Sequence, residues 1–125
     1  MANPEPILVV EDDEQIREAL CELLEDAGYR TVGVGNGQEA LTYLANGQRP
    51  CLIVLDLMMP VMDGWQFRRE QQRDPALATI PVLVVTAAGN RNGDELTNVD
   101  VIAKPFKMEE LMTAVARNCA RPGNG

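Results

Sequence analysis

The sequence predicts an α/β fold, a doubly wound (βα)5 sandwich of three layers around a central parallel sheet of five strands. Four mainly apolar runs support this fold, and each ends at a polar or charged residue; they cover residues 7–10, 51–55, 81–85 and 99–103. Runs without polar alternation are typical of strands that are buried on both faces, as in a parallel sheet. Between the runs the apolar period becomes helical, and strands that alternate with helices favour the doubly wound arrangement.

Helix and strand signals order the elements in the first half of the chain. Residues 13–27 carry apolar side chains at helical spacing, and Gly28 is expected to cap the end of that helix. Residues 31–34 form a short strand that a glycine weakens, so we expect it at an edge of the sheet. Asn36 is expected to cap a second helix, which ends near residues 46–47. The apolar face of the first helix comprises Ile16, Leu20, Leu23, Leu24 and Ala27.

The helices of the second half differ in how apolar they are. A helix from about residue 64 to Arg73 has only Trp65 and Phe67 as clearly apolar residues, so it should be the most solvated of the long helices. Residues 94–98 leave room for only a turn or two of helix. The last helix has a clear apolar stripe, formed by Met108, Leu111, Met112, Val115 and Cys119.

Length and composition indicate a single domain over residues 1–125, with a core of about residues 6–120. The hydrophobic share of 46% and the charged share of 24% are ordinary for soluble proteins. No apolar stretch is long enough to cross a bilayer, and the first residues lack the features of a secretory signal. A cytoplasmic location is therefore expected.

Charge and residue types exclude several functions. The net charge of −8 argues against direct binding to nucleic acid or to a membrane. The chain has no histidine, which excludes histidine-based catalytic triads and histidine-containing zinc sites. Cys21, Cys51 and Cys119 form no CxxC pair, so we expect reduced, mostly buried thiols, with a redox role as the weaker alternative.

Three acidic residues are expected to meet at one edge of the sheet. Glu11 and Asp12 follow the first strand, and Asp56 follows the run at 51–55. Because the carboxyl ends of parallel strands share an edge, where open α/β sheets bind ligands, these side chains should lie close together. Close carboxylates repel one another unless a cation lies among them, and carboxylate oxygens with water are the ligands that Mg²⁺ prefers. A solvated acidic rim remains the alternative for the acids at 11–13 alone, and the absence of a GxxxxGK segment excludes a P-loop.

Two further polar residues end the remaining strands. Thr86 offers a hydroxyl, and Lys104 offers an ammonium group that could pair with a carboxylate or with phosphate oxygens. Alone, Thr86 could cap the following loop and Lys104 could form a surface ion pair of little value. Their arrival at consecutive strand ends favours a site shared with the acids.

With these motifs the chain resembles the receiver domain of bacterial two-component response regulators, over essentially its whole length. The similarity lies in residues 7–13, 56–64, 86–87 and 104–106. It implies a flavodoxin-like three-layer sandwich. It also implies a phosphoacceptor that assists its own phosphoryl transfer and autodephosphorylation, rather than an enzyme in the usual sense.

The resemblance implies roles for particular residues. Asp56 would accept the phosphoryl group and also bind the metal. Asp12 and Glu11 would form the acidic pair that holds Mg²⁺ directly and through water. The backbone carbonyl of Met58 would supply a further ligand.

Three more residues would contact the phosphoryl group. By the same resemblance, the Thr86 hydroxyl would move to it, Lys104 would pair with it, and the backbone amide of Ala87 would donate to it. A carboxylate is a weak nucleophile, so binding of the phosphoryl oxygens by Mg²⁺ and by the lysine is most of what the transfer requires. Asp13 aligns outside the acidic pair and is expected to cap the first helix.

The resemblance also implies partners. The phosphoryl donor would be a phosphohistidine on a sensor histidine kinase or a histidine phosphotransfer protein, or a small acyl phosphate. A downstream protein of unknown identity would read the change of surface. We expect a monomer or weak dimer without direct contact to nucleic acid or membrane.

Three alternative functions are compatible with parts of this pattern. A pseudo-receiver would keep the fold and dock partners without phosphorylation. A phosphatase of the haloacid dehalogenase type needs an acid two residues after its nucleophile, where this chain has Met58. A flavodoxin-like flavin binder is disfavoured because an acidic first loop repels phosphate.

Two features depart from the pattern of most family members. Val101 stands three residues before Lys104, where most members have Tyr or Phe, and the stretch from Thr86 to Lys104 is shorter than usual. We therefore expect the output surface to lie elsewhere than on the face that the family's fourth helix, fifth strand and fifth helix usually form.

Overall fold

The fold was analysed in a computed structural model of the chain, which describes residues 5–56, 64–86, 100–103 and 106–119. Among these residues, no helix is long and apolar enough to span a membrane. The strands are β1 (Ile7–Val10), β2 (Thr31–Val34), β3 (Leu52–Leu55), β4 (Val82–Thr86) and β5 (Asp100–Ala103); the helices are α1 (Glu14–Asp26), α2 (Gly37–Ala45), α3 (Gly64–Arg73), α4 (Pro75–Ala78) and α5 (Met108–Asn118). The short helix expected at 94–98 lies outside the described residues.

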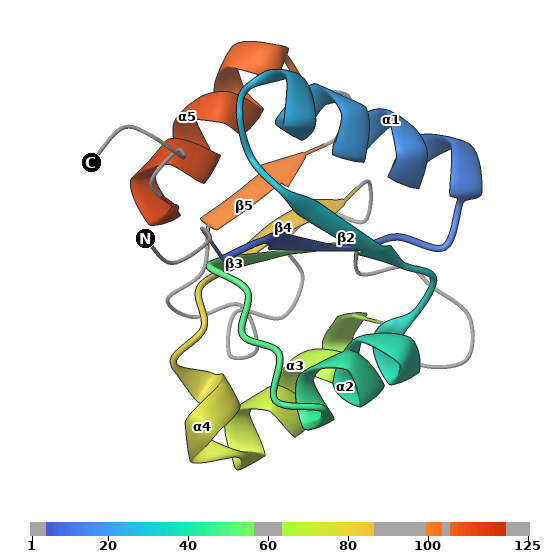
Figure 1. Cartoon of the computed structure of the whole chain (residues 1–125), viewed down its shortest axis with the longest axis vertical. Helices are drawn as coiled ribbons and strands as arrows, with labels where there is room; N and C mark the ends of the chain where they lie inside the picture. Colours follow the sequence, from blue (N-terminus) through green and yellow to red (C-terminus); the bar gives the residue numbers. More distant parts are fainter. Residues whose placement is uncertain (1–4, 57–63, 87–99, 104–105, 120–125) are drawn as a thin grey trace.

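The strands form one parallel sheet in the order β2-β1-β3-β4-β5. Helices α1 and α5 cover one face of the sheet, and α2, α3 and α4 cover the other (Figure 1). The predicted doubly wound fold is therefore confirmed. The glycine-containing strand β2 lies at an edge, as expected, and β3 lies at the centre.

The sheet is buried on both faces because successive strand residues point to opposite sides. Along β1, Ile7 and Val9 join the core beneath α1 and α5, whereas Leu8 and Val10 join the core beneath α2 and α3. All four side chains are at most 1% exposed. This two-sided burial explains why the strands have no polar alternation.

The predicted caps are present at the ends of α1 and α2. The Asp13 carboxylate accepts hydrogen bonds from the backbone N–H groups of Gln15 (2.9 Å) and Ile16 (3.1 Å). Gly28 has a φ of 101°, which glycine adopts without steric cost. Asn36 accepts from the N–H of Glu39 at 2.9 Å. Local sequence signals therefore set these helix ends.

The prediction that α3 is the most solvated long helix is wrong. Arg68 and Gln71 are buried, and Arg68 Nη1 donates to Gln71 Oε1 at 2.7 Å. The Gln71 amide donates in turn to the carbonyl oxygens of Leu77 (2.9 Å) and Ile80 (3.1 Å). Burial lowers the pKa of Arg68 from its usual value. The polar residues of α3 thus form a buried network that holds the unpredicted helix α4 and the approach to β4.

The buried apolar faces of α1 and α5 are shorter along the helix than predicted. Ile16 on α1 is 40% exposed, and Met108 on α5 is 54% exposed. The buried part of each helix face lies further along, at Leu20 and Leu24 in α1 and at Leu111 in α5. Each exposed residue lies in the first turn of its helix, so helical spacing alone overestimated the packed length.

The prediction of three reduced cysteines is also wrong. Cys51 and Cys119 form a disulfide, with Cα atoms 5.5 Å apart and a sequence separation of 68. Cys51 precedes β3 and Cys119 caps α5, so only the packing of α5 on the sheet brings them together. Cys21 is a free, half-buried thiol, and burial raises its pKa above the usual 9.0.

Candidate metal centre

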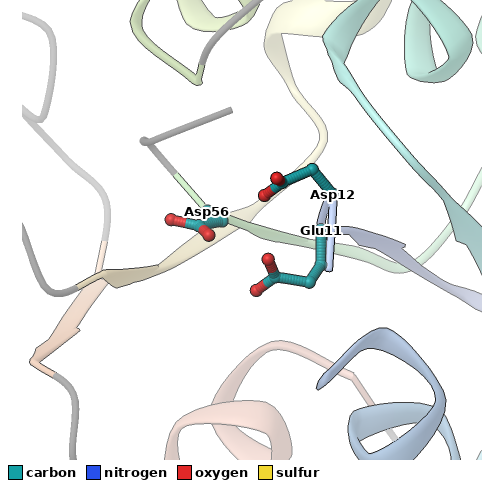
Figure 2. Close-up of side chains that lie close together, drawn as sticks. All are labelled: Glu11, Asp12 and Asp56. Carbon is teal, nitrogen blue, oxygen red and sulfur yellow. The ribbon is translucent and has the colours of Figure 1, made fainter. Parts of the chain in front are cut away.

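Three carboxylates converge at the carboxyl edge of the sheet. Glu11 and Asp12 follow β1, Asp56 follows β3, and these two strands pair with Val10 opposite Leu55. Oxygens of the three carboxylates lie within 4.8 Å of one another. Figure 2 shows the side chains of Glu11 and Asp12 extending from the end of β1 toward the side where Asp56 lies. The predicted meeting of the acids is therefore present.

Backbone hydrogen bonds fix where two of these side chains begin. The N–H of Asp56 donates to the carbonyl of Val10 at 3.1 Å, and the N–H of Glu11 donates to the carbonyl of Val34 at 3.1 Å. The ladder of the sheet thus continues past the last strand residues. The backbones of both acids are thus held by hydrogen bonds of the sheet.

Burial distinguishes the members of the cluster. Glu11 is 3% exposed and Asp56 is 8% exposed, whereas Asp12 is exposed. Glu11 Oε2 also accepts a hydrogen bond from the N–H of Asp13 at 3.3 Å. Buried carboxylates this close together are costly unless positive charge compensates them. The open side at Asp12 gives solvent, and ions in it, access to the buried pair.

The donor set fits a hard divalent cation. All three side chains offer oxygen, which is what Mg²⁺ and Ca²⁺ bind. Oxygens bound directly to one Mg²⁺ lie at most about 4.2 Å apart, because each bond is about 2.1 Å long. Carboxylates within 4.8 Å can therefore share one ion, some directly and some through water.

Of the remaining predicted site residues, the structure describes only Thr86. Thr86 is the last residue of β4 and pairs in register with Ala103 of β5, so its backbone lies at the same edge of the sheet. Met58, Ala87 and Lys104 lie outside the described residues. The roles of these four residues stay predictions.

Sequence reasoning missed one residue beside the acids. Arg17 of α1 donates from Nη1 to the backbone carbonyl of Glu11 at 2.9 Å. It lies four positions after the helix cap Asp13, so it returns to the face of α1 that carries the cap. A basic residue at this spacing after an acidic strand end is the signal that could have identified it.

Comparison with known proteins identifies the family. The family of response regulator receiver domains matches residues 7–116. The chain is 36% identical over 124 residues to response regulator Rre1 of Synechocystis, covering 94% of this chain and 52% of that protein. It is 35% identical over 123 residues to the phosphate regulon transcriptional regulatory protein PhoB of Pseudomonas aeruginosa, covering 95% of this chain and 53% of that protein. The chain thus spans about half the length of these relatives.

Solved structures agree in fold. The Vibrio cholerae chemotaxis protein CheY4 is 28% identical, with a TM-score of 0.81 and coverage of 93% of this chain and 99% of that one. The receiver domain of the sensor histidine kinase PA1611 of Pseudomonas aeruginosa is 31% identical, with a TM-score of 0.81 and coverage of 93% and 98%. That structure holds a magnesium ion coordinated in its active site cleft. Fold, acidic strand ends and family match agree: the chain belongs to the response regulator receiver domains of two-component systems.

Proposed function

We propose that this receiver domain accepts a phosphoryl group on Asp56, with Mg²⁺ bound at the carboxylate cluster, and that this switches a protein–protein interaction. The observation that carries the proposal is the convergence of Glu11, Asp12 and Asp56 at the ends of β1 and β3. Mg²⁺ in the receiver domain of PA1611 supports the choice of metal. The donor would be a phosphohistidine on a sensor histidine kinase or a histidine phosphotransfer protein.

The chemistry assigns a different task to each residue. An oxygen of Asp56 forms a bond to phosphorus while the bond from phosphorus to the donor nitrogen breaks. A carboxylate nucleophile has no proton to lose, so the step needs no general base, which suits a chain without histidine. Glu11 and Asp12 would hold the metal, and bound Mg²⁺ supplies charge that stabilises the phosphoryl oxygens during transfer.

Two further residues complete the proposal. Thr86 and Lys104 would contact the oxygens of the phosphoryl group once this group is bound to Asp56. The two residues follow from the family pattern, and their substitution should slow the transfer or change how long the phosphoryl group persists. The domain acts as a stoichiometric phosphoacceptor in this scheme.

The output is proposed to be a contact with another protein. The net charge of −8 disfavours direct contact of this chain with nucleic acid or an anionic membrane. We propose that the chain acts as a monomer or weak dimer in the cytoplasm.

Intact mass spectrometry after incubation with acetyl phosphate and Mg²⁺ tests the proposal. We expect one added phosphoryl group in the wild type and none in Asp56→Asn or in the presence of EDTA. Asp26→Asn removes an exposed carboxylate at the end of α1 and should be modified like the wild type. Modification that persists in Asp56→Asn would contradict the assignment, and an unmodified wild type would instead support the phosphorylation-independent docking module.

A further inference from the structure

The side chain of Arg17 connects helix α1 to the end of β1. Its Nη1 donates to the backbone carbonyl of Glu11 at 2.9 Å, and its own backbone N–H donates to the carbonyl of Asp13 at 2.8 Å. The hydrogen bond from a guanidinium is charge-assisted and stronger than one between neutral groups. Arg17 therefore holds both ends of the short connection that carries Asp12.

The absence of a side chain at Gly33 in β2 leaves space for the side chain of Arg17. A Cβ placed on Gly33 would lie 3.1 Å from both Cγ and Cδ of Arg17, which is tighter than ordinary contact. A Cβ placed on Gly35 would lie 3.6 Å from Nη1. The apolar stem of Arg17 thus crosses β2 at Gly33, and its guanidinium lies near the end of β2. Glycine at this strand position is explained by the close approach of a side chain rather than by a weak strand alone.

Glu11 is held at three points as a result. Its N–H is bonded to Val34, its carbonyl oxygen to Arg17, and its Oε2 to the N–H of Asp13. The carbonyl is the point at which the chain leaves the sheet and turns toward Asp12. Loss of that bond frees the segment that aims two of the three carboxylates.

We infer that Arg17 is a positioning residue for the carboxylate cluster, and that Gly33 provides the space that this role requires. The inference rests on the magnesium site proposed above. Hydrogen bonds to the metal-ligating groups themselves change metal affinity by about 10- to 100-fold when they are removed. The Arg17 bond acts on the backbone of a ligand residue, so we expect the lower end of this range. We therefore expect Arg17 to act on Mg²⁺ affinity through the geometry of Glu11 and Asp12.

The sign of the effect separates this role from a simple effect of charge. A guanidinium near the cluster repels Mg²⁺, so removal of its charge alone would tighten metal binding. Loss of positioning would weaken metal binding instead. The two explanations of Arg17 thus predict changes in opposite directions.

A Mg²⁺ titration followed by amide chemical shifts of the full chain tests the inference. Arg17→Met keeps the apolar stem over Gly33 and removes the donor, and it should raise the Kd for Mg²⁺ by about tenfold. Arg17→Lys keeps a charged donor and should restore most of the affinity. Arg73→Met removes an exposed arginine of α3 and should leave the Kd unchanged, because this residue pairs with Glu70 on its own helix.

A second variant leaves the charge in place. Gly33→Ala should push the arginine stem aside and raise the Kd by a smaller factor, so it decides the question even if Arg17→Met fails to fold. An unchanged or lower Kd in these variants, while the wild type binds Mg²⁺, would overturn the role of Arg17 and leave the proposed function intact. A wild type that binds no Mg²⁺ would overturn the proposed metal site and this inference with it.

Discussion

Asp12 is the exposed member of a cluster whose other two carboxylates, Glu11 and Asp56, are buried. Like charges this close raise the free energy of the metal-free fold. A cation that binds only the native state lowers it again, by about 2.7 kcal/mol at a hundredfold excess over its Kd. Single charges at this edge therefore link folding to metal binding.

Asp12→Ala should melt at a higher temperature than the wild type in EDTA, because one of three repelling charges is gone. The same variant should respond little to Mg²⁺, because a ligand is gone as well. Thermal unfolding with and without metal measures both effects. Glu22→Ala, which removes an exposed carboxylate of α1, should keep the full response to Mg²⁺. An Asp12→Ala protein less stable than the wild type in EDTA would refute the repulsion argument.

Gln71 offers a test of the buried network in α3. Gln71→Met keeps the side-chain volume but leaves the carbonyl oxygens of Leu77 and Ile80 without this donor, and Arg68 without this acceptor. We expect a loss of about 3 kcal/mol in the free energy of unfolding, measured by urea denaturation. Gln72→Met, at an exposed neighbouring position, should change it by less than about 0.5 kcal/mol. Equal effects of the two substitutions would show that the network contributes nothing.

Among the elements, β5 departs from the pattern of most family members at Val101. Val101 on β5 is 37% exposed and has no ring that could move inward if Thr86 moves as the family resemblance implies. A partner surface built there would lack an aromatic anchor of the kind that dominates binding energy. We therefore predict that the output surface lies on α1 or on the segment that follows Asp56 in sequence.

Beryllofluoride, a mimic of the phosphoryl group, tests where the change of surface occurs. Amide chemical shifts on its addition should concentrate at residues 58–64 and 86–93. They should be weak at Val101 and along residues 107–117. Large shifts spread over α5 would show that the usual route operates without its aromatic residue.

In the whole molecule, the disulfide and the carboxylate cluster lie at opposite ends of the central strand β3. Cys51 precedes β3 and Asp56 follows it, so one strand separates the two features. The disulfide ties β3 to the end of α5 and closes a long loop, which restricts the unfolded chain. It should therefore affect global stability and leave the metal site unchanged.

Reduction should lower the free energy of unfolding by about 4 kcal/mol on the chain-entropy estimate for a loop of this length. The corresponding fall in Tm is on the order of 10 °C. Calorimetry with and without reductant measures it, and Cys51→Ser should melt like the reduced wild type. Cys21→Ser should keep the difference between the two redox states. A Tm that is the same with and without reductant would contradict the role of the disulfide in stability. A Mg²⁺ affinity that changes with reductant would contradict its independence from the metal site.

Local sequence patterns and one general rule of topology were sufficient to predict several features of this protein. Continuous apolar runs mark strands because both faces of the sheet are covered. Asp13 and Asn36 begin helices by accepting hydrogen bonds from nearby backbone N–H groups, and Gly28 ends one through its positive φ. The acids at 11–12 and Asp56 could be placed together because parallel strands end at a shared edge. None of these predictions required knowledge of how helices pack.

Contacts between residues of different elements, in contrast, depend on how the whole chain packs. Periodicity treats Arg68 of α3 as solvent-facing, but the packing of α3 on the sheet buries it. The bond from Arg17 to the Glu11 carbonyl depends on the closeness of α1 to β2, and the disulfide at Cys51 depends on where α5 ends. Helical spacing specifies the direction of a side chain relative to its own axis. The position of that axis against the sheet is set by the packing of the whole core, which no local pattern encodes.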